Sequence, residues 1–181
     1  MNDAVPTILL VDDEPINLEI LTEYLEDSDY RIESAGDGQQ AWALLEAEPE
    51  RFDVVMLDRM MPGMTGTQVL ARMKQHPLLD SVPVILQTAL SARGDVLEGL
   101  QAGAYYYLTK PFDQEMLLSV VATAVEDRQR YRQAQEDSKL AGRTFGLMRE
   151  ASFSFRDLDA ARDLARVLAN ACPDPMRAAI G

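Results

Sequence analysis

Five polar residues that could support phosphorus chemistry follow apolar runs of the sequence. They are Asp12 and Asp13 after TILLV, Asp58 after DVVML, Thr88 after VPVILQ, and Lys110 close behind AYYYL. A carboxylate can act as a nucleophile toward phosphorus. Crowded carboxylates favour a counter-cation, and Mg²⁺ takes a couple of carboxylates together with water and phosphate oxygens. A lysine and a hydroxyl would neutralise the phosphoryl oxygens, so the set fits metal-assisted phosphoryl transfer.

Each of these residues also has an ordinary explanation when it is taken alone. Asp12 and Asp13, ahead of Pro15, could simply cap a helix. Asp58 could be a turn residue, and an isolated threonine or lysine carries no functional signal. Their shared position at the ends of successive apolar runs is what favours a common site.

The elements that must position these residues alternate between strand and helix. Expected strands cover Thr7–Val11, Tyr30–Ala35, Asp53–Leu57, Val82–Gln87 and Ala104–Leu108, and expected helices start at Pro15, cover Gln39–Glu48, Gly66–Gln75 and Ser91–Gln101, and follow Asp113. Apolar strands between helices indicate a parallel sheet covered on both faces. We therefore predict an α/β fold, a (βα)5 doubly wound parallel sheet of strand order 2-1-3-4-5, with ligands bound beyond the carboxyl ends of the strands.

The composition is that of a soluble chain with an acidic body. The 181 residues carry a net charge of -13, and residues 126–181 are close to neutral, with 10 Lys and Arg against 9 Asp and Glu. An acidic body repels nucleic acid, and we find no helix-turn-helix pattern or basic stripe, so we expect no direct nucleic-acid contact. The N-terminus predicts no signal peptide and no membrane span. With the single cysteine, Cys172, these features indicate a cytoplasmic protein.

Four stretches carry a family resemblance. ILLVDDEP, MLDRMMPGMTG, VILQTAL and YYYLTKPF resemble a two-component response-regulator receiver of the CheY-like superfamily, from Thr7 to about Val125. The resemblance implies that Asp58 accepts a phosphoryl group from a sensor histidine kinase or a phosphotransfer protein. It implies that Asp13, Asp58 and the backbone carbonyl of Met60 bind Mg²⁺, while Asp12 helps through water.

The resemblance also implies roles at the other strand ends. Lys110 would pair with the carboxylate or the phosphate, and Thr88 would move to bond the phosphoryl group. Tyr107 would change rotamer with Thr88, which would alter the face made by the helix over Ser91–Gln101, the next strand and the last helix. The Lys110–Pro111 bond would be cis. Such a domain is a switch with self-phosphorylation and self-dephosphorylation chemistry, and not an enzyme with an external substrate.

Three positions depart from the usual family pattern. Thr65 stands where many members carry an aspartate, and we expect little loss because Gly66 still permits the turn. Met60 and Leu90 occupy positions that tune dephosphorylation, and neither can bond an attacking water. We therefore expect a phosphoryl half-life of minutes or longer, and a half-life of seconds in the purified protein would contradict this.

The chain beyond the receiver predicts an extended fifth helix and a small, mostly helical extension. We divide the chain into residues 1–125 (receiver), 126–144 (helical extension or linker, ending near Gly142) and 145–181 (incomplete output or dimerisation segment). The last segment resembles the start of a GHKL-type ATP-binding output domain that looks truncated, without its nucleotide-binding part. We expect a homodimer, formed through this tail or through the fifth helix.

Two other function classes and one other role for the chain are alternatives to a receiver that is switched by phosphorylation. A haloacid-dehalogenase-like phosphohydrolase would need an aspartate two residues after the nucleophile, where this chain has Met60. A flavodoxin-like binding module would need Ser, Thr or Gly after the first strand, where Asp12, Asp13 and Glu14 would repel a phosphate. A phosphorylation-independent dimerisation or scaffold module remains the alternative to the switch.

Overall fold

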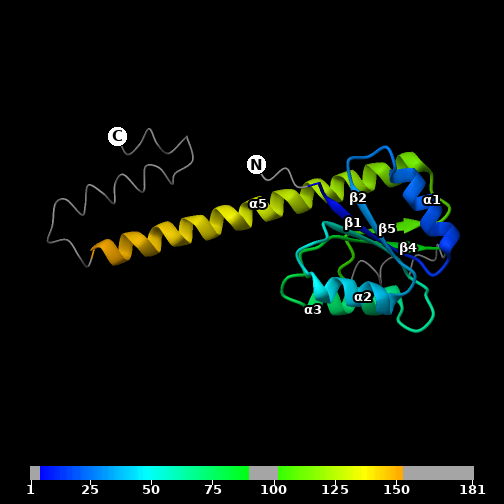
Figure 1. The fold of residues 1–181 in the computed structure, drawn as a ribbon, viewed down its shortest axis with the longest axis horizontal. Coiled ribbons are helices and arrows are strands. Elements are labelled where there is room, and N and C mark those ends of the chain that lie inside the picture. The colour runs from blue at the N-terminus through cyan, green and yellow to red at the C-terminus, as the bar shows by residue number, and fades with distance from the viewer. Residues whose placement is uncertain (1–4, 90–101, 153–181) are drawn as a thin grey trace. The chain divides into compact units, whose positions relative to one another are not determined.

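The computed structural model describes residues 5–89 and 102–152, with side chains as far as residue 141. In chain order the elements are β1 (Thr7–Val11), α1 (Pro15–Leu25), β2 (Arg31–Ala35), α2 (Gly38–Ala47), β3 (Val54–Asp58), α3 (Gly66–Gln75), β4 (Val84–Thr88), β5 (Tyr106–Thr109) and α5 (Gln114–Ser152) (Figure 1). The helix expected over Ser91–Gln101 and the tail segment from residue 153 lie outside the described residues.

The five strands form one parallel sheet in the order β2-β1-β3-β4-β5, which confirms the predicted topology. Every residue of β1, β3 and β4 is buried. Strands covered on both faces bury every side chain, which is why these segments are almost continuously apolar. β4 begins at Val84 and not at Val82, because the intervening Pro83 has no N–H to donate to the ladder.

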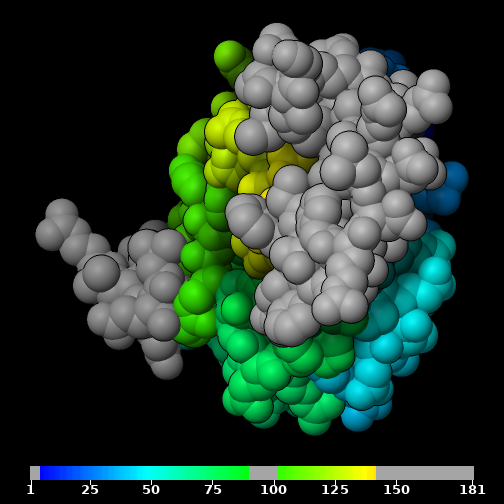
Figure 2. Space-filling view, turned by 90° about the vertical axis from the view of Figure 1, so that its left-hand side faces the viewer, coloured from blue at the N-terminus to red at the C-terminus, as the bar shows by residue number. Residues whose placement is uncertain are grey.

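Alternating strand residues supply two apolar layers, one on each face of the sheet. Helices α2 and α3 cover one face, and α1 with the first turns of α5 covers the other (Figure 1). The first layer contains Leu9, Leu57 and Leu86, and the second contains Leu10 and Met56. In Figure 2 the surfaces of the α2 and α3 segments adjoin, as their contacts require.

The start of α3 is fixed tightly against the end of β3. Thr65 caps the helix by accepting from the Gln68 N–H at 3.3 Å, and the Gln68 side chain accepts from the Thr65 N–H at 3.0 Å. A side chain at Gly66 would place its Cβ 2.1 Å from the Asp58 carbonyl oxygen. Gly66 is thus needed for close approach rather than for an unusual backbone angle, and Thr65 has a capping role of its own.

Helix α5 is longer than expected. It continues through Gly142 to Ser152, whereas the sequence suggested an end near Gly142. A glycine within a helix costs only about 1 kcal/mol relative to alanine, which the helix-forming residues before it can offset. The chain divides into two compact units, Met1–Tyr131 and Arg132–Gly181.

The described part of the chain contains no helix whose length and apolar character would suit a membrane crossing.

Candidate functional site

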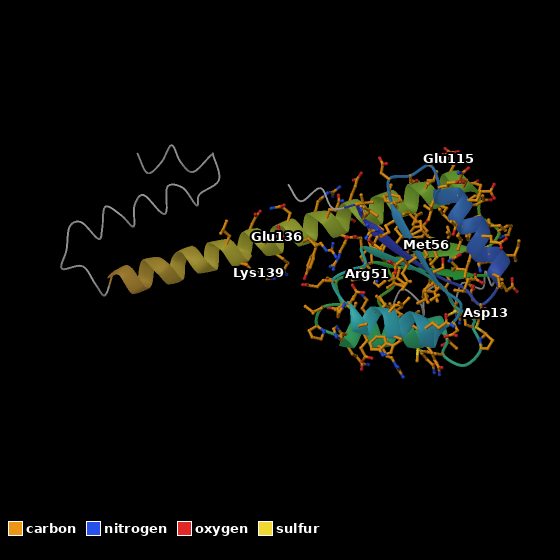
Figure 3. All side chains as sticks on the ribbon, in the orientation of Figure 1. Asp13, Arg51, Met56, Glu115, Glu136 and Lys139 are labelled. Carbon is orange, nitrogen blue, oxygen red and sulfur yellow. The ribbon has the colours of Figure 1, made fainter. Side chains whose placement is uncertain are left out.

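The predicted site residues gather beyond the carboxyl ends of the strands. Figure 3 shows Asp13 at this end of the domain, and Arg51, which precedes β3, at the opposite end. A pocket of about 350 Å³ opens there, and most of the residues that line it are polar: Asp12, Asp13, Glu14, Asn17, Asp58, Met60, Thr88, Ala89 and Lys110. The topology therefore brings together residues that lie up to a hundred positions apart in the sequence.

Lys110 joins the two buried carboxylates of this pocket. Its Nζ donates to Asp12 Oδ2 at 2.7 Å and to Asp58 Oδ1 at 2.8 Å. Burial alone would lower the pKa of the Lys110 ammonium, but the hydrogen bonds to Asp12 and Asp58 and their negative charges outweigh it and raise this pKa. The site therefore holds a permanent cation between two aspartates.

The second oxygen of each carboxylate is held by the start of the following loop. Asp58 Oδ2 accepts from the Met60 N–H at 2.8 Å. Asp12 Oδ1 accepts from the Glu14 N–H at 3.0 Å and from Asn17 Nδ2 at 2.9 Å. These bonds fix both carboxylates in orientation.

Asn17 is a site residue that the sequence reasoning missed. Its side-chain amide also donates to Glu14 Oε2 at 3.1 Å, so one amide connects two of the acidic side chains. Its position in the first turn of α1, three residues after Glu14, was the available signal. Glu14 occupies the N-cap position of α1 without a side-chain capping bond, so the acidic stretch is not simply a helix cap.

Thr88 and Tyr107 lie on neighbouring strands, and the alternation of strand residues puts both side chains on the same face of the sheet. Thr88 is buried and lines the pocket, and its carbonyl accepts from the Lys110 N–H at 2.7 Å. Tyr107 does not line the pocket. It packs against the apolar layer that contains Leu86, and its buried hydroxyl has no hydrogen-bond partner among the described residues.

The carboxylates of Asp12, Asp13 and Asp58 lie farther apart than the sequence suggested. No group of three or more potential metal-binding side chains forms among the described residues. Asp12 and Asp58 are drawn toward Lys110, while Asp13 is exposed. Four acidic side chains still line a pocket that contains one lysine. This excess of carboxylate oxygens fits Mg²⁺, which needs only one or two carboxylates and keeps several waters.

Two further expectations concern the Lys110–Pro111 peptide bond and the two residues tied to slow dephosphorylation. The Lys110–Pro111 peptide bond is cis, as the resemblance implied. Met60 is 63% exposed at the edge of the pocket. Leu90, the other residue tied to slow dephosphorylation, lies outside the described residues.

Comparison with known proteins identifies a family. The model of the response regulator receiver domain matches residues 8–122. The chain is 38% identical over 150 residues to response regulator PleD of Caulobacter vibrioides, a match that covers 80% of this chain and 31% of PleD. The chain thus spans about a third of the length of that relative.

Solved structures share the fold. Chemotaxis protein CheY4 of Vibrio cholerae is 31% identical with a TM-score of 0.61, over 67% of this chain and 99% of CheY4. The BeF3-activated DrrB receiver domain is 35% identical with a TM-score of 0.59, over 67% of this chain and 98% of that domain.

Proposed function

This chain belongs to the response regulator receiver family, and from that premise we propose that it is a phosphorylation-driven switch whose acceptor is Asp58. The phosphoryl group comes from a phosphohistidine of a sensor histidine kinase or of a phosphotransfer protein, in the cytoplasm. The observation that carries the proposal is the buried Asp58 carboxylate, bonded to Lys110 and the Met60 N–H at the mouth of the pocket.

The chemistry needs little more than positioning and charge. An Asp58 oxygen forms a bond to phosphorus while the bond from phosphorus to the donor's leaving atom breaks, and that atom keeps the electron pair and takes a proton. Lys110 neutralises charge on the phosphoryl oxygens, and the Thr88 hydroxyl donates to one of them. The Met60 N–H orients the attacking carboxylate.

A divalent cation would complete this neutralisation. Asp13, Asp58 and the Met60 carbonyl would hold Mg²⁺, with Asp12 acting through water. The metal supplies positive charge next to the phosphoryl oxygens, which offsets the repulsion between them and the acidic pocket.

Phosphorylation then acts on Thr88 and Tyr107, which lie on the side of the sheet opposite to the Asp58 side chain. Thr88 moves toward the phosphoryl group, Tyr107 moves into the space that Thr88 leaves, and the molecular surface to which β5 and α5 contribute changes shape. The buried hydroxyl of Tyr107 supports this role, because no bond to another described residue opposes its movement. The phosphoryl group must favour one of two states for this to be a switch.

We propose that α5 transmits the conformational change of the receiver to the rest of the chain. Its first turns pack on the sheet, and it continues to Ser152. We propose that its second part pairs with a second copy of the chain. The resemblance of residues 145–181 to the start of a GHKL-type domain remains a prediction, and no ATP-binding activity is proposed.

Intact mass with a small phosphodonor tests the acceptor. We expect the protein to gain about 80 Da, the mass of one phosphoryl group on a side chain, only when Mg²⁺ is present. Asp58→Asn should abolish the gain, and the exposed Asp27→Asn should leave it unchanged. No gain in the unmodified protein would leave the phosphorylation-independent scaffold as the better account.

A further inference from the structure

Gln87 is an unusual residue for the interior of this sheet. It is the fourth residue of β4, it is 0% exposed, and neither Oε1 nor Nε2 has a hydrogen-bond partner among the described residues. A buried amide without a partner destabilises the folded state, because it has lost its hydrogen bonds to water. A methionine or leucine would fill the same space without this cost, so the amide calls for a functional explanation.

The sheet register places Gln87 beside the acceptor. Gln87 lies directly across from Asp58 on β3 and from Leu108 on β5. The alternation of strand residues puts Gln87 on the same face as Ile85, in the layer that contains Met56 and Leu108. The same alternation puts Asp58 on that face.

Lys110 must cross this position to reach the carboxylates. It follows β5, whereas its partner Asp12 follows β1 and its partner Asp58 ends β3, and β4 lies between β3 and β5. The lysine side chain therefore runs over the end of β4, where Gln87 is the last residue but one. Gln87 itself does not line the pocket, so any effect on a bound phosphoryl group passes through Lys110.

Among the described residues, one hydrogen of the Lys110 ammonium has no acceptor. An ammonium has three N–H donors, and two of them bond Asp12 and Asp58. When Asp58 becomes an acyl phosphate, it loses its charge at the carboxylate, and its bond to Lys110 weakens. A neighbouring acceptor that cannot be displaced by water would then keep the ammonium in place.

Resting on the function proposed above, we propose that Gln87 is a positioning residue of the acceptor site. Its Oε1 accepts the third N–H of Lys110 once Asp58 is phosphorylated, and this bond holds the ammonium against the phosphoryl oxygens. The amide has no partner among the described residues in the resting state and gains one in the phosphorylated state, so its pairing favours phosphorylation.

Gln87→Met tests the inference, because methionine keeps the length and shape of glutamine and removes the amide. Gln39→Met, at an exposed glutamine of α2, is the matched control. We expect Gln87→Met to slow phosphorylation by a small phosphodonor with Mg²⁺ by roughly three- to tenfold, the effect of one hydrogen bond. Its melting temperature should stay equal to or above that of the unmodified protein, and Gln39→Met should change neither quantity.

A spectroscopic measurement separates positioning from a structural effect. In the unmodified protein, the side-chain amide signal of Gln87 is assigned by its loss in Gln87→Met. Addition of Mg²⁺ with beryllofluoride should shift this signal and leave that of Gln39 in place. Unchanged phosphorylation of Gln87→Met, or a melting temperature that falls with it, would overturn the inference while leaving Asp58 as the acceptor. Absence of phosphorylation in the unmodified protein would instead overturn the proposed function itself.

Discussion

At the residue scale, the site is organised around one lysine and two aspartates. Asp12 is 1% exposed and Asp58 is 8% exposed, so both charges are largely removed from water. Such charges are tolerated only when they are paired and hydrogen-bonded. Lys110, the Met60 N–H, the Glu14 N–H and Asn17 provide those bonds.

Lys110→Met should therefore destabilise the protein as well as impair phosphorylation. It leaves two neighbouring buried carboxylates without their cation, and breaking a buried pair in this way costs about 3 kcal/mol. Urea unfolding would measure the loss, and Mg²⁺ should restore more stability to Lys110→Met than to the unmodified protein. Lys139→Met, on the exposed part of α5, should behave like the unmodified protein. An equal response to Mg²⁺ in both proteins would count against a cation site in this pocket.

Most of the candidate site could be predicted from the sequence, because Asp12, Asp13, Asp58, Thr88 and Lys110 each end a strand or lie just after one. The role proposed for Gln87 could not be predicted from the sequence. A single glutamine within an apolar strand forms no pattern, and the proposal depends on its amide having no partner among the described residues. The exposure of Asp13 could not be predicted either, because it depends on the pairing of Lys110 with Asp12 and Asp58 and not with Asp13.

At the element scale, α5 is attached to the sheet by apolar and polar contacts. Leu117, Val121 and Ala124 are buried in the layer beneath it. Two polar bonds follow one turn later. The Tyr105 hydroxyl donates to Asp127 Oδ2 at 2.7 Å, and Arg128 donates to Ser81 Oγ at 2.6 Å. Movement of β5 can thus be transmitted to α5 through Tyr105.

The Tyr105–Asp127 bond should give stability a measurable dependence on alkaline pH. Burial, followed by this hydrogen bond and the Asp127 charge, raises the pKa of the Tyr105 hydroxyl from 10.0 to about 12. A raised pKa means that the bond stabilises the fold fully below pH 10 and that this stability is lost as pH approaches 12. Tyr105→Phe should cost about 1 kcal/mol at neutral pH, the value of one hydrogen bond, and less as the pH rises.

Urea unfolding of both proteins across this range would check the prediction. Tyr24→Phe, at a partly buried tyrosine of the same apolar layer, is the control. A difference between Tyr105→Phe and the unmodified protein that stays constant with pH would show that the hydroxyl proton is not responsible.

The elements themselves were predictable wherever the local signals agreed. The strand Thr7–Val11 and the helix Gly66–Gln75 match the sequence prediction residue for residue, because apolar runs and a capping box mark their ends. The end of α5 was not predictable, since Gly142 is a weak helix breaker. Strand ends elsewhere differ by one or two residues, where pairing with the neighbouring strand decides the boundary.

At the scale of the whole molecule, the chain combines a receiver with a helix that continues beyond it. Residues 133–141 of α5 are all exposed, including Leu140, and Tyr131 just before them is 46% exposed. A helix that is exposed on every side is marginal alone in water. Pairing with a second copy would bury its thin apolar seam of Tyr131, Ala134 and Leu140.

Light scattering on the full chain and on residues 1–131 should show whether dimerisation depends on the second part of α5. Residues 1–131 form the first compact unit and keep the Asp127 and Arg128 contacts of α5. We expect a dimer for the full chain and a monomer for residues 1–131. Two monomers, or two dimers, would exclude a dimer that depends on residues 132–181.

The central claim is that Asp58 is the residue that receives the phosphoryl group. Borohydride reduces an acyl phosphate to an alcohol, so reduction of the phosphorylated protein converts the acceptor aspartate into homoserine. Peptide mapping by tandem mass spectrometry after treatment with a phosphodonor and Mg²⁺ should find homoserine at position 58 and unmodified aspartate at Asp12 and Asp13. Homoserine at another aspartate, or a phosphoryl group on His76, would contradict the account.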